Sequence, residues 1–259
     1  DPFLGKSAFA GPVIEFGADG GSFAGQARFS GCIACTNWRR SDVEAILPPY
    51  LELATNTTAP ELHPVVFIFG EQSDGAILFA GFTVRTGVTY HELGIVVPFV
   101  QHHRGRHLHS YVPRMYASYF PSVWHGNANY GFSKEMARMG WQGPVFLLTR
   151  ENGSLLLHAE TEPAGTWSPG SSCDAPNFGA MRAIFELPVI GRRGDGSHVC
   201  SYFGWSFEDA LVRPSDACVS IHAPLVAGIR PRRHHDVPGG TFEVRGMLWR
   251  LSWPVPCRF

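Results

Sequence analysis

Lysine is almost absent from this 259-residue chain. The sequence has 21 lysines and arginines together, and only Lys6 and Lys134 are lysines. A reaction that needs the primary amine of a lysine side chain therefore has two candidates. Lys134 stands near the middle of the chain and Lys6 lies close to its beginning.

Charge and long apolar runs are scarce as well. Charged residues make up 17% of the chain and nearly cancel, to a net charge of -1. Such a balance gives no reason to expect a nucleic acid or an anionic membrane as partner. No apolar run approaches the roughly 18 residues that a membrane-spanning helix needs. We therefore expect a cytoplasmic protein that binds a small molecule, with neither nucleic acid nor membrane as partner.

Turn-forming and aromatic residues are abundant. The chain holds 29 glycines and 20 prolines, and 13% of its residues are aromatic. Segments rich in valine, isoleucine, phenylalanine and tyrosine are bounded by glycine, proline or aspartate, which is typical of strands. We expect one mainly β (α+β) domain over residues 1–259, with residues 1–25 as an N-terminal arm and a few short helices. The expected strands cover residues 26–36, 65–69, 76–85, 88–100, 108–119, 145–150, 155–161, 180–187, 198–207, 217–222 and 241–253.

Several local signals refine this pattern. Ser41 and Glu44 have the spacing of a capping box, which predicts a short helix that ends before Pro48. Residues 121–133 are expected to form a loop, followed by a helix from Ser133, as N-cap, to Gly140, as C-terminal stop. Residues 151–153 predict a hairpin turn, and residues 230–235 a basic loop.

The six cysteines give a weaker signal. Cys32 and Cys35 have the spacing of a redox pair or of half a zinc site, but no second such pair exists. Because the segment is predicted as a strand, the two side chains should point to opposite faces. We therefore expect ordinary buried thiols there.

Lys134 follows an aromatic, glycine-containing segment, residues 129–133. Aromatic neighbours and the positive end of the predicted helix would both favour the neutral amine. A neutral amine attacks a ketone carbonyl and forms a Schiff base, which then acts as an electron sink. Glu135, the next residue, opposes this effect if it turns inward. A solvated lysine on a surface helix is the alternative interpretation.

Four short motifs in order resemble the acetoacetate decarboxylase-like superfamily. They cover most of the chain, and no single one is specific. They are Leu-Pro-Pro-Tyr-Leu-Glu-Leu at 47–53, Tyr-His-Glu-Leu-Gly-Ile-Val-Val-Pro at 90–98, Gly-Phe-Ser-Lys at 131–134 and Pro-Asn-Phe at 176–178. The resemblance implies an antiparallel β barrel or cone with short helices, a homo-oligomer, and a lysine-dependent reaction that needs no cofactor.

The resemblance also assigns roles to individual residues. Lys134 would form the Schiff base, and Glu92 would be the carboxylate beside the substrate. Tyr130 and Phe132 would form walls of the substrate pocket, and Arg28 would bind a substrate carboxylate.

The chain departs from the family pattern at several positions. The decarboxylases have a second lysine where this chain has Glu135, and a proline where it has Ser133. Their Gly-Arg-Glu stretch is Gly-Asn-Ala here, at residues 126–128, and Ile68 stands where a second carboxylate is expected. We therefore expect a keto acid other than acetoacetate as substrate, with decarboxylation or aldol condensation and dehydration as the reaction. Trp124, close to the lysine, suggests a pocket for a larger or aromatic molecule.

Two other functions compete with this prediction. His102, His103, His107 and His109 fall within eight positions, so a metal-dependent enzyme is conceivable, although the cluster contains no carboxylate. A non-catalytic barrel that binds an apolar ligand is the other alternative, and it predicts no covalent adduct at Lys134.

Overall fold

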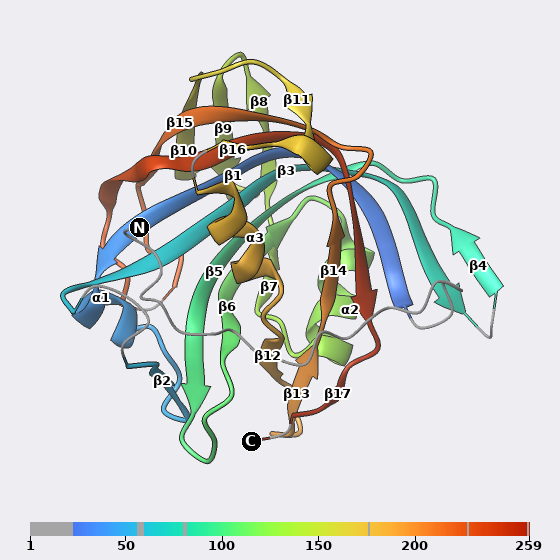
Figure 1. Cartoon of the computed structure of the whole chain (residues 1–259). Coiled ribbons are helices and arrows are strands. Elements are labelled where there is room, and N and C mark those ends of the chain that lie inside the picture. The colour runs from blue at the N-terminus through green and yellow to red at the C-terminus, as the bar shows by residue number, and fades with distance from the viewer. Residues whose placement is uncertain (1–22, 56–59, 80–81, 176, 227, 258) are drawn as a thin grey trace.

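The fold was determined as a computed structural model, which describes residues 23–55, 60–79, 82–175, 177–226, 228–257 and 259. It is mostly β, with few helices, as the sequence predicted (Figure 1). The strands are β1 (Phe23–Arg39), β2 (Leu51–Leu53), β3 (Leu62–Phe79), β4 (Phe82–Arg85), β5 (Tyr90–His102), β6 (His109–Ala117), β7 (Lys134–Met136), β8 (Arg138–Gln142), β9 (Val145–Thr149), β10 (Leu155–Pro163), β11 (Ser168–Pro169), β12 (Val189–Arg192), β13 (His198–Ser201), β14 (Phe203–Ser206), β15 (Leu211–Ile221), β16 (Arg232–Ser252) and β17 (Val255–Pro256). The helices are α1 (Arg40–Glu44), α2 (Phe120–Tyr130), α3 (Phe178–Phe185) and a single 3-10 turn, η1 (Gly170–Ser172).

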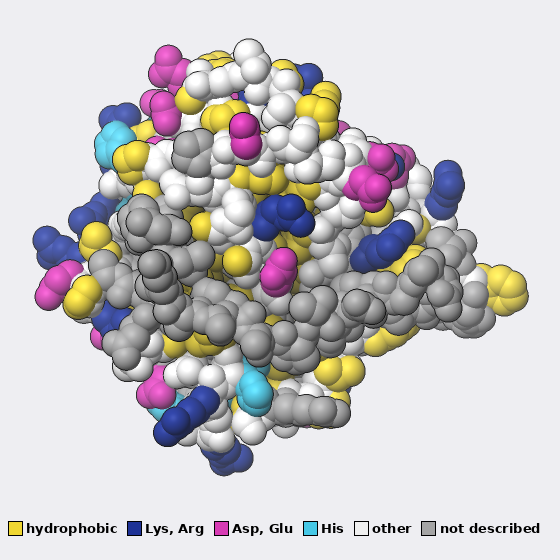
Figure 2. All heavy atoms as spheres, in the orientation of Figure 1, with side chains coloured by type: hydrophobic (Ala, Val, Ile, Leu, Met, Phe, Trp, Pro, Cys, Tyr) yellow, Lys and Arg dark blue, Asp and Glu magenta, His cyan; other side chains and the backbone are white. Residues whose placement is uncertain are grey.

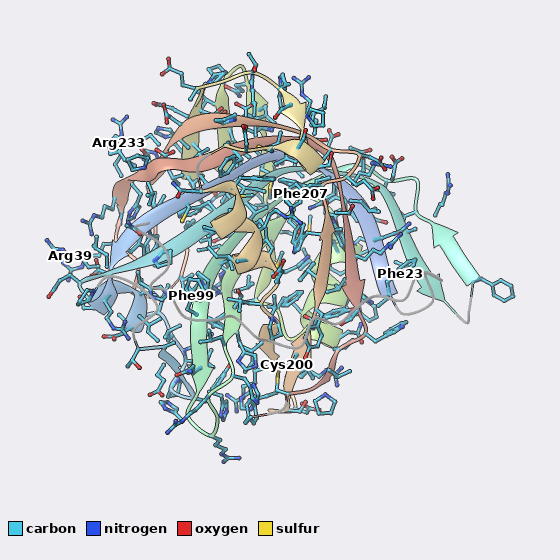
Figure 3. The ribbon with its side chains drawn as sticks, viewed as in Figure 1. Phe23, Arg39, Phe99, Cys200, Phe207 and Arg233 are labelled. Carbon is cyan, nitrogen blue, oxygen red and sulfur yellow. A yellow bond between two sulfur atoms is a disulfide. The ribbon has the colours of Figure 1, made fainter. Side chains whose placement is uncertain are left out.

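Long strands form the frame of the molecule. Strands β16, β1, β3, β5 and β6 pair in that order, each antiparallel to the next. Figure 3 shows Phe23 and Arg39, the two ends of β1, on opposite sides of the molecule. Beyond β16 the sheet continues through β15, β10, β9 and β8. The pairings among the described residues do not close this sheet, so closure into a barrel remains a prediction.

The central strands bury both of their faces. Phe67 and Phe69 of β3 point to one face, where Phe69 lies 5.0 Å from the ring of Phe146 on β9. Val66 and Ile68 of the same strand point to the other face, which α3 and β14 help to cover. This arrangement follows from the two-residue period of a strand. It gives the sheet a packed core on one side and a second apolar layer on the other.

The cysteines follow the same alternation. Cys32 belongs to the first apolar layer and Cys35 to the second, as the strand prediction required. Both thiols are free, and burial raises the pKa of Cys35 to about 12. Cys200 and Cys257 form a disulfide that joins β13 to the segment after β17.

Two helices lie where the sequence analysis did not put them. Residues 120–130, expected mostly as a loop, form α2, with Pro121 in its first turn and Gly131, at φ +65°, as its C-cap. The helix predicted from Ser133 to Gly140 is wrong, because these residues contain β7 and part of β8. Residues 180–187, predicted as a strand, lie largely in α3.

Smaller corrections concern the ends of elements. Ser41 makes no side-chain cap hydrogen bond in α1, and Glu44 instead pairs with Arg40 at 3.0 Å. The predicted basic loop is partly strand, since β16 begins at Arg232. The predicted arm contributes its last three residues, 23–25, to β1. The rest of the arm, with Lys6, and Pro176 of the fourth motif lie outside the described residues.

The surface carries no large block of one charge on the face that Figure 2 shows, where basic and acidic side chains are scattered. None of the helices in the described part of the chain is long and apolar enough to cross a membrane.

Candidate active site

A cavity of about 410 Å³ lies on the second face of the central sheet. Its walls come from β1, β3, β5, β6, β14 and β16 together with α2, α3 and β7. Most of its lining is apolar, as in pockets that bind small organic molecules. The apolar lining includes Phe29, Ile68, Val96, Met115, Phe132, Ile184, Phe185, Phe203, Trp205 and Trp249.

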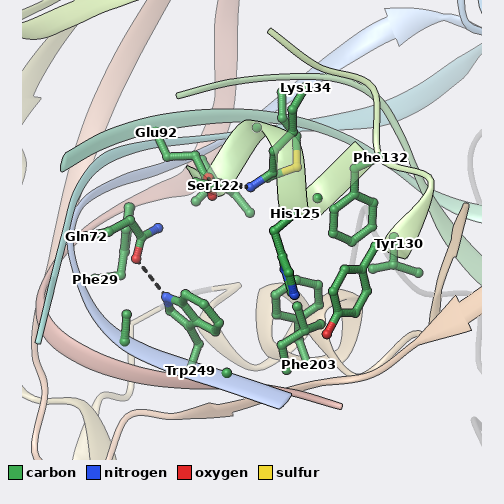
Figure 4. Close-up of a pocket in the computed structure, with 18 of the residues that line it drawn as sticks. Phe29, Gln72, Glu92, Ser122, His125, Tyr130, Phe132, Lys134, Phe203 and Trp249 are labelled. Atoms are coloured by element: carbon green, nitrogen blue, oxygen red, sulfur yellow. Dashed lines mark hydrogen bonds and ion pairs between the residues drawn. The ribbon is translucent and has the colours of Figure 1, made fainter. Parts of the chain in front are cut away.

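Lys134 and Glu92 meet inside this cavity (Figure 4). Lys134 Nζ lies 2.7 Å from Glu92 Oε2, and the two side chains are only 9% and 12% exposed. Glu92 points into the cavity because it shares the face of Gly94 and Val96 on β5. Removing two charges from water is costly unless they pair with good geometry. The Lys134–Glu92 ion pair is therefore a charged group in the otherwise mostly apolar lining of the cavity.

Two hydroxyl groups complete the polar cluster around the amine. Ser122, in the first turn of α2, accepts a hydrogen bond from Lys134 Nζ at 3.1 Å and lies 3.4 Å from Glu92 Oε2. The same hydroxyl is 3.4 Å from Tyr90 Oη. Burial, and then the charge of Glu92, raises the pKa of Tyr90, so its phenol stays protonated at neutral pH. The cluster therefore holds one amine, one carboxylate and two neutral hydroxyls.

α2 fixes the position of Lys134 in two ways. Gly126 leaves a groove for the lysine side chain, because a Cβ at this position would lie 2.8 Å from Lys134 Cδ. Asn127, one residue later, bonds the backbone of Lys134 on both sides, donating to its carbonyl at 3.0 Å and accepting from its N–H at 2.7 Å. The helix that was expected to begin at Ser133 is absent, and the amine instead donates a hydrogen bond to Ser122 in the first turn of α2.

Glu135 points away from this cluster. It is exposed, on the opposite side of β7 from Lys134, and it pairs with Arg114 of β6. The strand explains this geometry, because successive side chains alternate between faces. Glu135 therefore does not compete with Glu92 for the amine.

Aromatic side chains form the rest of the wall near Lys134. Tyr130 and Phe132 stack with their ring centroids 5.4 Å apart, and the Tyr130 hydroxyl donates to the Ser252 carbonyl at 3.1 Å. Trp124 is 61% exposed and lies at the rim of the cavity. His125 also lines the cavity, and burial, then the charge of Lys134, lowers its pKa. His125 is therefore neutral at pH 7.

Arg28 is not part of this site. Its neighbours Ala27 and Phe29 line the cavity, but Arg28 points elsewhere. Its guanidinium donates to the Gly246 carbonyl at 2.9 Å and lies 3.9 Å from Asp74. The expected carboxylate-binding arginine is therefore absent from the lining, in which no described residue is an arginine.

The histidine cluster does not form a metal site in the structure. Among the described residues, no three histidine, cysteine, aspartate or glutamate side chains come close enough together to hold an ion. His109 begins β6 and is buried, whereas His107 precedes the strand and is exposed. The two side chains therefore do not share a strand face.

The sequence analysis missed four residues that shape the site: Tyr90, Ser122, Gly126 and Asn127. Tyr90 stands two positions before Glu92 on one strand, so the two-residue period was a signal for it. The other three lie on α2, where Ser122 and Gly126 share a face because they are four residues apart. Predicting that segment as a loop hid this arrangement.

Comparisons with known proteins were made for the whole chain. No family model and no curated protein matches it. Among solved structures, acetoacetate decarboxylase from Legionella pneumophila is similar, with a TM-score of 0.57, 15% identity, and coverage of 90% of this chain and 87% of that one. The enduracididine biosynthesis enzyme MppR, complexed with pyruvate, has a TM-score of 0.56, 16% identity, and coverage of 98% and 97%. An acetoacetate decarboxylase-like enzyme from Sphingomonas wittichii RW1 has a TM-score of 0.54, 13% identity, and coverage of 91% and 94%.

These likenesses extend over nine-tenths or more of the chain although the sequences share about one residue in seven. A fold tolerates such divergence, whereas an activity depends on particular side chains. The chain therefore has the acetoacetate decarboxylase-like fold and is a divergent example of it.

Proposed function

We propose that this protein is a Schiff-base-forming lyase that acts on a keto acid, with Lys134 as the nucleophile and Glu92 as its proton acceptor. The observation that carries the proposal is the contact of 2.7 Å between Lys134 Nζ and Glu92 Oε2 inside an apolar cavity. A structural ion pair needs no cavity beside it. Here the pair borders a space large enough for a small organic molecule.

The first step would form the imine. Glu92 accepts one proton from the Lys134 ammonium, and the neutral amine attacks the carbonyl carbon of the substrate. The attack forms the C–N bond and gives a carbinolamine, in which the former carbonyl oxygen is a hydroxyl group. Glu92 returns its proton to this hydroxyl, which leaves as water as the C=N double bond forms. The cationic iminium then stands where the ammonium stood, beside a Glu92 carboxylate that is ionised again.

The iminium supports two kinds of carbon–carbon chemistry. In decarboxylation of a β-keto acid, the electron pair of the bond to the carboxylate moves into the iminium, releasing carbon dioxide and leaving an enamine. In aldol chemistry, Glu92 removes a proton from the neighbouring carbon instead, and the resulting enamine attacks an aldehyde, after which water is lost. Both routes end with hydrolysis, which returns the lysine. Neither requires a cofactor, because the lysine itself accepts the electrons.

The names of the similar structures agree with this range of chemistry, since one is a decarboxylase and another is complexed with pyruvate. The cavity favours a substrate larger than acetoacetate, because aromatic rings line it and Ile68 contributes an apolar side chain where a second carboxylate was expected.

Borohydride trapping tests the proposal. Borohydride reduces an imine to a stable secondary amine, so pyruvate or acetoacetate should add mass to the peptide that contains Lys134. Lys6→Ala is the matched control, since it removes the only other lysine of the chain and should leave the labelling intact. Lys134→Ala should abolish it. The proposal is wrong if neither keto acid labels the Lys134 peptide and Lys134→Ala leaves any activity of the protein intact.

The same cavity also suits the alternative of a non-catalytic barrel that binds an apolar ligand. That function predicts saturable binding of an apolar molecule without a covalent adduct, so the trapping experiment separates the two.

A further inference from the structure

Gln72 is a buried polar residue that the proposed chemistry does not use. It lies on β3, is 5% exposed, and lines the cavity. In the pairing of β3 with β5, Gln72 stands opposite Tyr90, and Gly70 stands opposite Glu92. Gln72 and Glu92 are therefore diagonal neighbours on one sheet face, with their Cα atoms about 7–8 Å apart.

Trp249 fixes the orientation of the Gln72 amide. The indole N–H of Trp249, on β16, lies 2.7 Å from Gln72 Oε1. An indole nitrogen donates and never accepts, so the amide oxygen must face Trp249. The amino group is then directed into the cavity (Figure 4). No other hydrogen bond to this side chain is found within the described part of the chain.

An amide donor that lines a cavity needs an acceptor, which is either water or an oxygen atom of a bound molecule. The Gln72 amino group could be satisfied by an oxygen atom of a bound molecule. Because the diagonal spacing places this donor beside the Lys134–Glu92 pair, the oxygen and the reacting carbonyl would belong to one small molecule. A carboxylate next to, or one carbon away from, a ketone meets this requirement.

The charge of the lining supports a carboxylate held by a neutral donor. Lys134 is the one lysine or arginine among the described residues of the lining, and Glu92 already pairs with it. Decarboxylation disperses the negative charge of the carboxylate. A cation would stabilise the reactant more than the transition state, so it would slow that step. A neutral amide also holds the carboxylate in place, but it stabilises the reactant over the transition state less than a cation does.

We propose that Gln72, held by Trp249, is the specificity-determining residue that binds the carboxylate of a keto acid whose remaining substituent is apolar and of aromatic size. Trp205, Phe203 and Trp249 provide the surface for that substituent. Phe203 stacks with Trp205 at 5.3 Å and meets Trp249 edge-on at 6.0 Å, which leaves a broad aromatic wall. This inference rests on the proposed function, because the substrate must form an imine with Lys134.

The test compares two carbonyl compounds that share an apolar tail. Benzylpyruvate and benzylacetone differ in that the first has a carboxylate where the second has a methyl group. Borohydride trapping at Lys134 gives the half-saturating concentration for each compound, and the ratio of the two concentrations measures recognition of the carboxylate. Wild-type protein should prefer benzylpyruvate. Gln72→Met, which keeps the length of the side chain but removes the donor, should reduce that preference about tenfold, as expected for one hydrogen bond to a charged group.

Two further variants keep the test decisive. Trp249→Phe retains an aromatic ring but releases the Gln72 oxygen, so the amide can turn and the preference should fall, by a smaller factor. Gln101→Met is the matched control, since Gln101, on β5, donates a hydrogen bond to the Arg106 carbonyl and does not line the cavity. It should keep the wild-type preference.

The possible failures are distinguishable. If benzylacetone and benzylpyruvate both label Lys134 and the preference is unchanged in Gln72→Met and Trp249→Phe, the role of Gln72 is wrong while the proposed function stands. Should Gln72→Met fail to fold, the preference of Trp249→Phe decides the question alone. If no carbonyl compound labels Lys134 in the wild-type protein, both the proposed function and the role of Gln72 are wrong.

Discussion

Gly126→Ala should inactivate the protein without unfolding it. The substitution adds one methyl group on the face of α2 that borders the Lys134 side chain. A Cβ there would lie 2.8 Å from Lys134 Cδ and 2.9 Å from Cε, whereas carbon atoms in contact normally stay about 3.5–4.0 Å apart. The lysine side chain must therefore move by about 1 Å.

The displacement acts on the chemistry more than on stability. A misplacement of about 1 Å in a reacting group lowers rates by about a hundredfold. In contrast, alanine is favoured over glycine inside a helix by about 1 kcal/mol, which offsets part of the cost of moving a flexible side chain. The ion pair of Lys134 with Glu92 would lengthen from its present 2.7 Å. We therefore expect slow imine formation in a folded protein.

The rate of borohydride trapping with pyruvate, measured beside the thermal midpoint, checks this expectation. Gly179→Ala is the matched control, because Gly179 also lies in a helix, α3, and a Cβ there would meet nothing within 4 Å. It should leave the trapping rate unchanged. A wild-type trapping rate in Gly126→Ala would refute the argument that the groove positions the amine. A large fall in the thermal midpoint would refute the claim that the effect is local.

Three further predictions follow from the structure. Glu92→Gln removes the proton acceptor and should slow trapping about a hundredfold, whereas Glu135→Gln, on the exposed side of β7, should change it little; equal rates in the two variants would contradict the role of Glu92. Gly131→Ala should lower the free energy of unfolding by about 2–4 kcal/mol in a urea titration, because Gly131 has φ +65° and its Cβ would lie 2.5 Å from the Arg192 backbone. Burial lowers the pKa of His63 to about 4, so the folded state favours its neutral form. The neutral ring of His63 contributes fully to the stability of the folded state above the unfolded pKa of about 6.5, and this contribution is lost as the pH falls towards 4. The loss amounts to about 2 kcal/mol by pH 5. The pH dependence of the free energy of unfolding should flatten in His63→Gln, and an unchanged slope would contradict the assignment.

The sequence brought Lys134 and Glu92 into one candidate site, but it did not predict most of the residues that surround them. Lys134 and Glu92 are 42 positions apart, and periodicity alone does not bring them together. Their pairing was expected only because two motifs resembled one family. Gln72 belongs to no motif, and Gly126 was compared with the family only as part of a departing stretch. The importance of both depends on contacts between different elements of the fold. Arg28 shows the opposite error, since a shift of one residue along a strand moves a side chain to the other face.

The misplaced helices have a local explanation. The segment from Ser133 to Gly140 carries helix start and stop signals, yet pairing of β7 with β6 and of β8 with β9 outweighs them. α2 had signals of its own, with Pro121 in the first turn and Gly131 at the end. The residues of α3 form a short apolar run, a pattern that fits a buried strand or a helix equally well.

The alternation along β3 and β5 has a consequence for how this protein can change. On β3, Phe69 fills the core while Ile68 and Gln72 line the cavity, and on β5 Leu93 fills the core while Glu92 lines the cavity. Neighbouring positions on these strands therefore have different roles, because one packs in the core and the next contacts the space for a ligand. Substrate preference can drift at every second residue while the packing behind it stays intact. Because one layer of strands carries both sets of residues, the cavity lining can be substituted without a change in the packing of the core.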